Sequence, residues 1–182
     1  MDADPEQALV WAREVRVRLE RYPRNSWRED ATHGARFWLE IHDGFRRETG
    51  GLIALADEHR SGRRTAAQLA VVSAPRLNGM IARLRDHHEI EEFEYFPAFR
   101  ALEPKLAPGF DVLANDHARL QRHVDETVAA LAELLAAVAN DSAGMPRVTD
   151  HYAARAGELC RALERHLYDE EDLIIPLLLE RR

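Results

Sequence analysis

Two short segments of the sequence carry the same pattern of histidine, glutamate and proline. Both have the form His-x3-Glu-Glu-x4-Pro, once from His87 to Pro97 and again from His166 to Pro176. A step of four residues places the histidine and the first glutamate on one helix face about one turn apart, so that an imidazole nitrogen and a carboxylate oxygen can approach one metal region. Each segment is therefore a candidate pair of metal ligands.

The repetition of this pair is more informative than either copy alone. The chain has nine histidines, and roughly one His-x3-Glu pair is expected by chance, so a single copy would mean little. The neighbouring His88 and Glu92 share the spacing, but alignment of the two prolines selects His87 and Glu91. The repeat therefore predicts these four ligands: His87, Glu91, His166 and Glu170.

Four long stretches with hydrophobic residues every three or four positions predict four helices that would position these ligands. The predicted helices cover about Asp30 to His59, a stretch after Pro75 up to Leu102, Leu113 to Val138, and about Pro146 to Leu177, preceded by a shorter helix from Pro5 to Tyr22. On the third long helix the predicted inward residues include Val128 and Leu135. Short connections favour an all-α, up-down-up-down four-helix bundle at 29–182, with an extra N-terminal helical extension at 1–28.

Histidines also stand on the inward stripes of the first and third long helices, at His42 and His117. Ordinary bundles place Leu, Ile or Ala there, because a buried polar group is costly unless it is paired or bound to metal. Four histidines and two carboxylates exceed what one tetrahedral zinc site uses, which favours two metals. Imidazole and carboxylate ligands suit iron, manganese or zinc, and the absence of cysteine ligands argues against iron–sulfur chemistry. Iron is the expected metal.

These residues resemble the hemerythrin family, whose small bundles carry His on the first helix, His-x3-Glu on the second, His on the third and His-x3-acid on the fourth. The resemblance covers about residues 30–180. Oxygen-carrying members have a second histidine four residues after the third-helix histidine, where this sequence has Gln121. In some relatives the residue beside the second-helix histidine is a ligand, a role that the resemblance gives to His88. It thus implies seven ligands: His42, His87, His88, Glu91, His117, His166 and Glu170.

The family resemblance also implies a function. Such proteins hold two iron ions bridged by carboxylates and an oxo or hydroxo group, and one iron keeps a position open for dioxygen, nitric oxide or peroxide. Sensing, storage or transport of such a small ligand is the expected role, with manganese or zinc as possible substitutes for iron. The alternatives are a di-iron oxidase or oxygenase, an enzyme that removes peroxide or nitric oxide, and a metal store or interaction module.

Several structural alternatives stay open at the level of sequence. The His and Glu residues could form a buried network without metal. A ferritin-like di-iron site is disfavoured, because it uses Glu-x-x-His and no Glu lies three residues before any His in this chain. Tyr95, one turn beyond Glu91, is either core or close to the metals. Glu92 and Glu171 either belong to a solvated acidic face or orient a ligand histidine.

Composition and charge limit the possible partners and locations. A net charge of -7 argues against a nucleic-acid partner, since phosphate neutralisation needs a basic face. The single cysteine, Cys160, is expected to fill the core and fits a reducing compartment. No signal-peptide pattern or bilayer-length apolar stretch is visible, which predicts a cytoplasmic protein without a membrane partner. A monomer or homodimer is expected, in which Trp11, Val15 and Leu19 pack the N-terminal helix on the bundle or on a second subunit.

Overall fold

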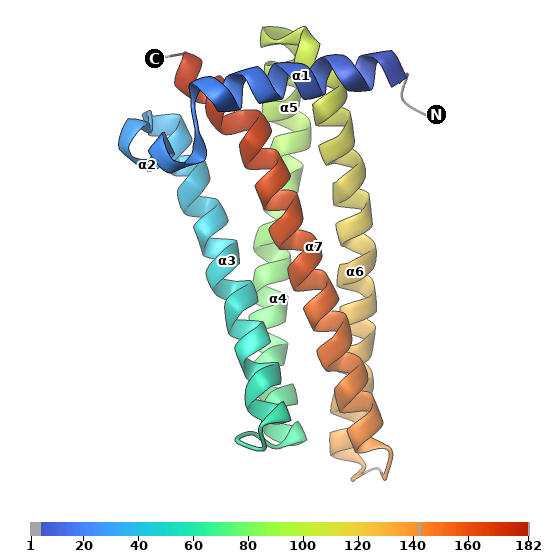
Figure 1. The fold of residues 1–182 in the computed structure, drawn as a ribbon. Coiled ribbons are helices and arrows are strands. Elements are labelled where there is room, and N and C mark those ends of the chain that lie inside the picture. The colour runs from blue at the N-terminus through green and yellow to red at the C-terminus, as the bar shows by residue number, and fades with distance from the viewer. Residues whose placement is uncertain (1–4, 142, 182) are drawn as a thin grey trace. The chain divides into compact units, whose positions relative to one another are not determined.

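The computed structural model describes residues 5–141 and 143–181, with side chains from residue 12 onward, and all regular structure in this part of the chain is helical. The elements are α1 (Pro5–Arg21), η1 (Arg24–Ser26), α2 (Trp27–Asp30), α3 (His33–Arg60), α4 (Ala66–Ile90), η2 (Glu91–Tyr95), α5 (Phe96–Leu102), η3 (Pro104–Leu106), α6 (Ala107–Ala139) and α7 (Met145–Glu180) (Figure 1). The predicted all-α fold is confirmed.

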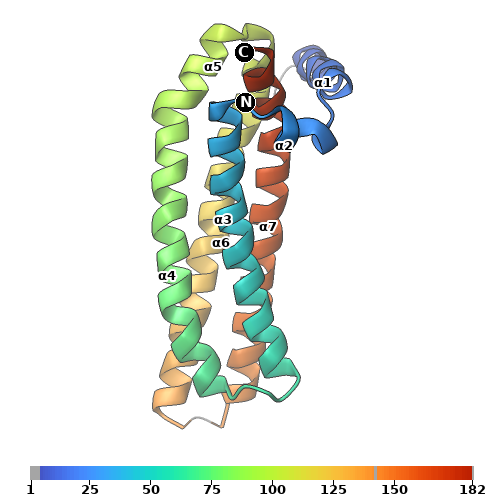
Figure 2. The same ribbon diagram turned by 90° about the vertical axis from the view of Figure 1, so that its left-hand side faces the viewer.

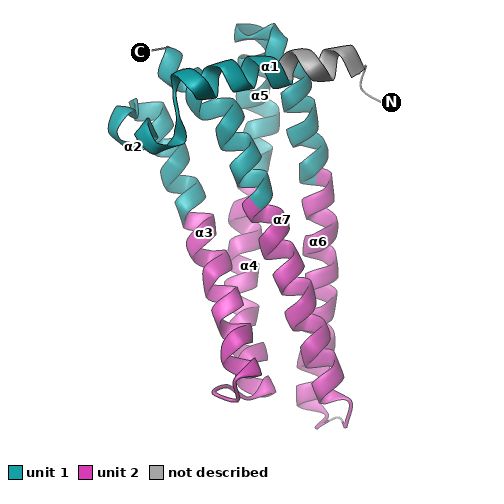
Figure 3. Ribbon diagram, in the orientation of Figure 1, with its two compact units in different colours: residues 1–43, 87–117, 165–182 teal, residues 44–86, 118–164 magenta. Residues whose placement is uncertain are grey.

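The chain forms two compact units, and α3, α4, α6 and α7 each contribute a segment to both. Unit 1 comprises residues 1–43, 87–117 and 165–182, and unit 2 comprises residues 44–86 and 118–164 (Figure 3). Within unit 2, short turns join α3 to α4 and α6 to α7, so that consecutive segments run in opposite directions (Figure 2). This is the up-down-up-down order of a helical bundle that the sequence predicted.

The helix α4 begins ahead of Pro75, so the predicted start after this proline was wrong. Thr65 and Gln68 form a reciprocal cap, in which the Gln68 N–H donates to Thr65 Oγ1 at 3.2 Å and the Thr65 N–H donates to Gln68 Oε1 at 3.0 Å. A proline removes one donor from the helical ladder. Leu69 before Pro75 and Leu77 after it are both buried, so the inner face of α4 stays continuous past the missing hydrogen bond.

The inner face of α6 also differs from the prediction. Val128 and Leu135 are 42% and 37% exposed, whereas Thr127 and Leu134 are fully buried. Because a helix turns once every 3.6 residues, its inner face advances by three residues at some steps and by four at others. The Thr127 hydroxyl tolerates burial because it donates to the His123 carbonyl at 2.7 Å.

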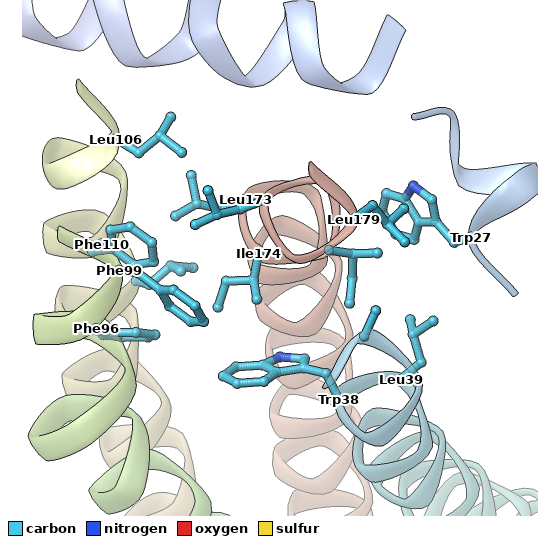
Figure 4. Close-up of a cluster of buried hydrophobic side chains, with 14 residues drawn as sticks. Trp27, Trp38, Leu39, Phe96, Phe99, Leu106, Phe110, Leu173, Ile174 and Leu179 are labelled. Carbon is cyan, nitrogen blue, oxygen red and sulfur yellow. The ribbon is translucent and has the colours of Figure 1, made fainter. Parts of the chain in front are cut away.

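Unit 1 has a core rich in aromatic side chains (Figure 4). Val15 and Leu19 of α1 pack against this core, and the Arg18 guanidinium of the same helix donates to the carboxylates of Glu103 at 2.8 Å and Glu180 at 3.1 Å. The N-terminal helix therefore packs on the bundle segments of its own unit, unit 1, while the Trp11 side chain lies outside the described residues. The buried members of the core are Trp27, Ala35, Trp38, Leu39, Phe96, Phe99, Leu106, Phe110, Leu113, Leu173, Ile174, Ile175, Leu177 and Leu179.

Cys160 belongs to the buried side chains of unit 2. It is 2% exposed, and its thiol donates to the Thr49 carbonyl with an Sγ to O distance of 3.7 Å. Burial raises the pKa of the Cys160 thiol to about 11, which fits its predicted role in the core. Among the described residues, no helix combines the length and the hydrophobicity that crossing a bilayer requires.

Candidate metal centre

The structure brings all seven predicted ligands together in unit 1, in two groups that share Glu91. Within each group, one possible ligand atom from every residue lies within 4.8 Å of the others. We call them the three-histidine cluster and the two-histidine cluster. The three-histidine cluster consists of His88, Glu91, His117 and His166. The two-histidine cluster consists of His42, His87, Glu91 and Glu170.

A π-helical turn begins at the shared glutamate. The Phe96 N–H donates to the Glu91 carbonyl five residues earlier, which places one residue more in this turn than an α-helix holds. Phe96 is thereby buried, while Tyr95 packs edge-on against Trp38 with ring centroids 4.9 Å apart. The matching stretch after Glu170 stays α-helical. The sequence repeat is therefore not a structural repeat, and Tyr95 has a packing role.

Two outer carboxylates hold two of the histidines by their Nδ1 atoms. Glu171 Oε1 lies 3.0 Å from His42 Nδ1, and Glu92 Oε1 lies 2.7 Å from His117 Nδ1. A histidine that donates its Nδ1–H to a carboxylate presents the lone pair of Nε2 to a metal. Each outer glutamate directly follows an inner glutamate in the sequence and orients a histidine from a different helix. Both of the predicted orienting residues therefore make such contacts.

The inner atoms of the two clusters fit a cation better than they fit one another. Among the described residues, no hydrogen bond reaches Nε2 of His42, His88, His117 and His166, or Oε2 of Glu170, while Glu91 Oε1 lies 2.8 Å from His87 Nε2. Glu91 Oε2 lies 3.5 Å from His117 Nε2, and Glu170 Oε2 lies 3.4 Å from His166 Nε2. Buried lone pairs without donors are costly, and metal ions would satisfy them.

The two inner glutamates differ in how many oxygens they can offer. The Trp38 indole N–H donates to Glu170 Oε1 at 2.8 Å, which leaves Oε2 as the ligand atom. That atom lies 3.6 Å from His42 Nε2 and 3.4 Å from His166 Nε2, one histidine from each cluster. Glu91, by contrast, turns one oxygen toward each cluster: Oε1 lies 2.8 Å from His87 Nε2, and Oε2 lies 3.5 Å from His117 Nε2. Glu91 is thus the best candidate for a bridging carboxylate.

Burial decides the protonation of the metal-free site. It raises the pKa of the Glu91 and Glu170 carboxyls, because a carboxylate loses its water, and for Glu170 the charge of Glu91 adds to this effect. Burial also lowers the pKa of four imidazoles, because a protonated imidazole loses its water. These imidazoles belong to His87, His88, His117 and His166.

The remaining histidines lie outside both clusters. His123 forms a third group with Glu126 and Glu158, in unit 2. The Arg155 guanidinium donates to both of these carboxylates, at 3.0 Å and 3.2 Å, and thus already supplies a positive charge. We assign no metal to this group. The others are His33, His59 and His151.

Sequence spacing did not indicate two features of the centre. The hydrogen bond from Trp38 to Glu170 joins residues far apart in the chain, and the π-helical turn has no proline or glycine to mark it. The only available signal for Trp38 was its place one turn before His42 on the same helix. Such a position indicates proximity to the site but not the partner of the indole N–H.

Comparison with known proteins agrees with this geometry. The model of the hemerythrin HHE cation binding domain matches residues 33–178, which include all seven candidate ligands. No curated protein and no solved structure matches the chain. The domain implies a metal-binding site, and the two clusters of His and Glu supply its candidate ligands. Because the match covers most of the sequence, the chain belongs to the hemerythrin HHE cation-binding family.

Proposed function

We propose that this protein binds two iron ions between its seven candidate ligands and uses them to bind dioxygen, nitric oxide or peroxide for sensing, storage or transport. The observation that carries the proposal is the pair of buried clusters that share Glu91 and in which Nε2 of His42, His88, His117 and His166 and Oε2 of Glu170 have no hydrogen bond. Two cations next to one another would satisfy those atoms, whereas one cation would leave a cluster unfilled.

The donor set supports iron as the resident metal. Imidazole and carboxylate ligands suit iron, manganese and zinc. With iron, the pair would supply two electrons and an open coordination position to a small ligand. The protein's share is to orient the ligands, through Glu92 and Glu171, and to keep bulk water away from them.

Aromatic rings on the clusters favour a small uncharged ligand. The Trp38 ring centroid lies 6.2 Å from that of His42, and the Phe96 ring centroid lies 5.6 Å from that of His117. Both aromatic side chains are buried. Such surroundings offer little hydration to an anion, so a diatomic molecule loses less on entry than an ionic substrate does.

Metal analysis followed by an oxygen test examines the proposal. Protein purified from iron-supplied cells should contain about two irons per chain, as a two-metal site requires. After anaerobic reduction, addition of oxygen should give a stable spectrum of the oxygenated protein. Rapid bleaching with formation of a product would instead support the alternative, an oxidase or a detoxifying enzyme. Protein without any transition metal would refute the proposal.

A further inference from the structure

Arg24, between α1 and α2, binds α7 through all three of its guanidinium nitrogens. Nη1 donates to Glu171 Oε2 at 3.1 Å, Nε donates to Asp172 at 2.9 Å, and Nη2 donates to the Tyr168 carbonyl at 2.6 Å. The guanidinium carbon also lies 3.4 Å from the centre of the Tyr168 ring and 4.7 Å from that of Trp27. A planar guanidinium with this many contacts is held in one orientation.

The Arg24 contact reaches the metal centre through Glu171. One oxygen of this buried carboxylate accepts from Arg24, and the other lies 3.0 Å from His42 Nδ1. A carboxylate taken out of water needs a cation or donors on both oxygens. Arg24 therefore fixes the rotation of the Glu171 carboxylate, and the carboxylate in turn fixes the ring of His42.

The corresponding carboxylate of the three-histidine cluster is differently placed. The Glu92 side chain, which holds His117, is 43% exposed, whereas the Glu171 side chain, which holds His42, is 4% exposed. Water can stabilise the charge of Glu92, but Glu171 has to obtain that stabilisation from the protein. The two-histidine cluster therefore depends more on a cation behind its outer carboxylate than the three-histidine cluster does.

We propose that Arg24 is a positioning residue for the two-histidine cluster, which it serves by holding Glu171 so that His42 presents Nε2 to the metal. Arg24 precedes residues 33–178, so the chain uses a residue outside the matched domain to complete the domain's metal centre. This inference rests on the proposed binding of two metals. Loss of Arg24 should weaken metal binding in one cluster and leave the other unchanged.

The inference is tested by titrating the full metal-free chain with Co²⁺. Visible absorption and calorimetry monitor the binding. The wild-type protein should bind about two Co²⁺ ions. Arg24→Ala should weaken one of the two binding steps roughly tenfold, at the lower end of what loss of outer support costs a metal site. Arg28→Ala is the matched control, because Arg28 also precedes the matched domain and donates to Asp43 at 2.9 Å, not to Glu171. Its two binding steps should equal those of the wild type.

A double variant separates positioning from a general loss of structure. In a Glu171→Gln background, Arg24→Ala should cause no further loss of Co²⁺ affinity, because both changes break the same chain of contacts. Circular dichroism should show unchanged helix content, and Arg24→Gln takes the place of Arg24→Ala if the latter does not fold. If the wild type binds no Co²⁺, the proposed function fails. If the wild type binds two Co²⁺ ions and the Arg24→Ala variant binds both with the same affinity, the inference about Arg24 is wrong. It is also wrong if the losses of affinity caused by Arg24→Ala and Glu171→Gln add in the double variant.

Discussion

Glu91 and Glu170 occupy equivalent positions in the sequence repeat, yet their surroundings differ. Glu91 lies in both clusters, whereas one oxygen of Glu170 accepts a hydrogen bond from Trp38. Equivalent spacing on two helices therefore gives two carboxylates with different capacities for ligation. The difference arises from a side chain on a third helix, α3, and it can be tested one residue at a time.

Replacement of the shared glutamate should remove more metal than replacement of its counterpart. Glu91→Ala takes a ligand from both clusters, so we expect it to lower the affinity of both metal-binding steps, each by roughly tenfold or more. Glu170→Ala should mainly weaken the two-histidine cluster. Metal analysis after dialysis against a weak chelator measures the difference. Equal metal contents in the two variants would contradict a bridging role for Glu91.

Loss of the indole N–H should destabilise the metal-free protein. Trp38→Phe keeps an aromatic ring in the core but leaves Glu170 Oε1 buried without its donor. A buried acceptor that loses its partner costs about 1 to 3 kcal/mol of unfolding free energy. Chemical denaturation of the metal-free protein measures this loss. Phe110→Leu, a change of another buried ring in the same core that removes no hydrogen bond, is the control for altered packing.

At the scale of the helices, periodicity predicted the number and order of the long elements and the face of each that carries ligands. The start of the second long helix was predicted wrongly, because Pro75 lies within α4 and not ahead of it. The signal that fixes the start of this helix is local, in the spacing of Thr65 and Gln68. Contacts made by Trp38 and Arg24 were not predictable from spacing, because their partners lie on α7, more than a hundred residues away.

The π-helical turn η2 makes a prediction at this scale. It equals an α-helix with one residue inserted, so deletion of the exposed Phe93 should restore a regular helix and keep both flanking faces in register. Deletion of the exposed Ala82, within the regular part of α4, should instead rotate the ligands of α4 by about 100°. We expect helix content and Co²⁺ binding to persist in the first variant and to be lost in the second. Equal damage in both would contradict this view of the turn.

At the scale of the molecule, unit 1 collects its candidate ligands from three separate stretches of sequence. All seven candidate ligands fall within residues 33–178. We propose that residues 1–28 are an extension of the bundle domain at 29–182. Arg18 and Arg24 join this extension to α7. Stability and metal binding should therefore be coupled across the described parts of unit 1.

The stability of the metal-free protein should depend on pH in two opposite ways. The pKa of the buried Glu91 carboxyl is raised from 4.5 to about 8, so the folded chain keeps a proton that the unfolded chain has lost, and stability falls as pH rises through this window. The lowered pKa of His88 and His166 means that only the unfolded chain gains those protons, so stability also falls as pH drops below 6.5.

Thermal unfolding across pH measures both effects, with and without Co²⁺. Bound metal requires deprotonated ligands, so it should remove the loss on the alkaline side and release protons on binding near pH 7, which an indicator dye detects. The pKa shifts of these groups set a window from about pH 5 to about pH 8. If the unfolding temperature of the metal-free protein stays constant across this window, the buried, shifted state of these groups is contradicted.

The position of Cys160 has a consequence for a protein proposed to meet oxidants. The residue is 2% exposed, and burial raises the pKa of its thiol to about 11, so almost no thiolate exists at physiological pH. The thiolate attacks a peroxide oxygen and the O–O bond breaks, so formation of sulfenic acid, like that of a mixed disulfide, requires access to the sulfur. With its one cysteine protected in this way, the chain offers peroxide no thiolate, so oxidation of a cysteine would not compete with a reaction of peroxide at the proposed metal pair.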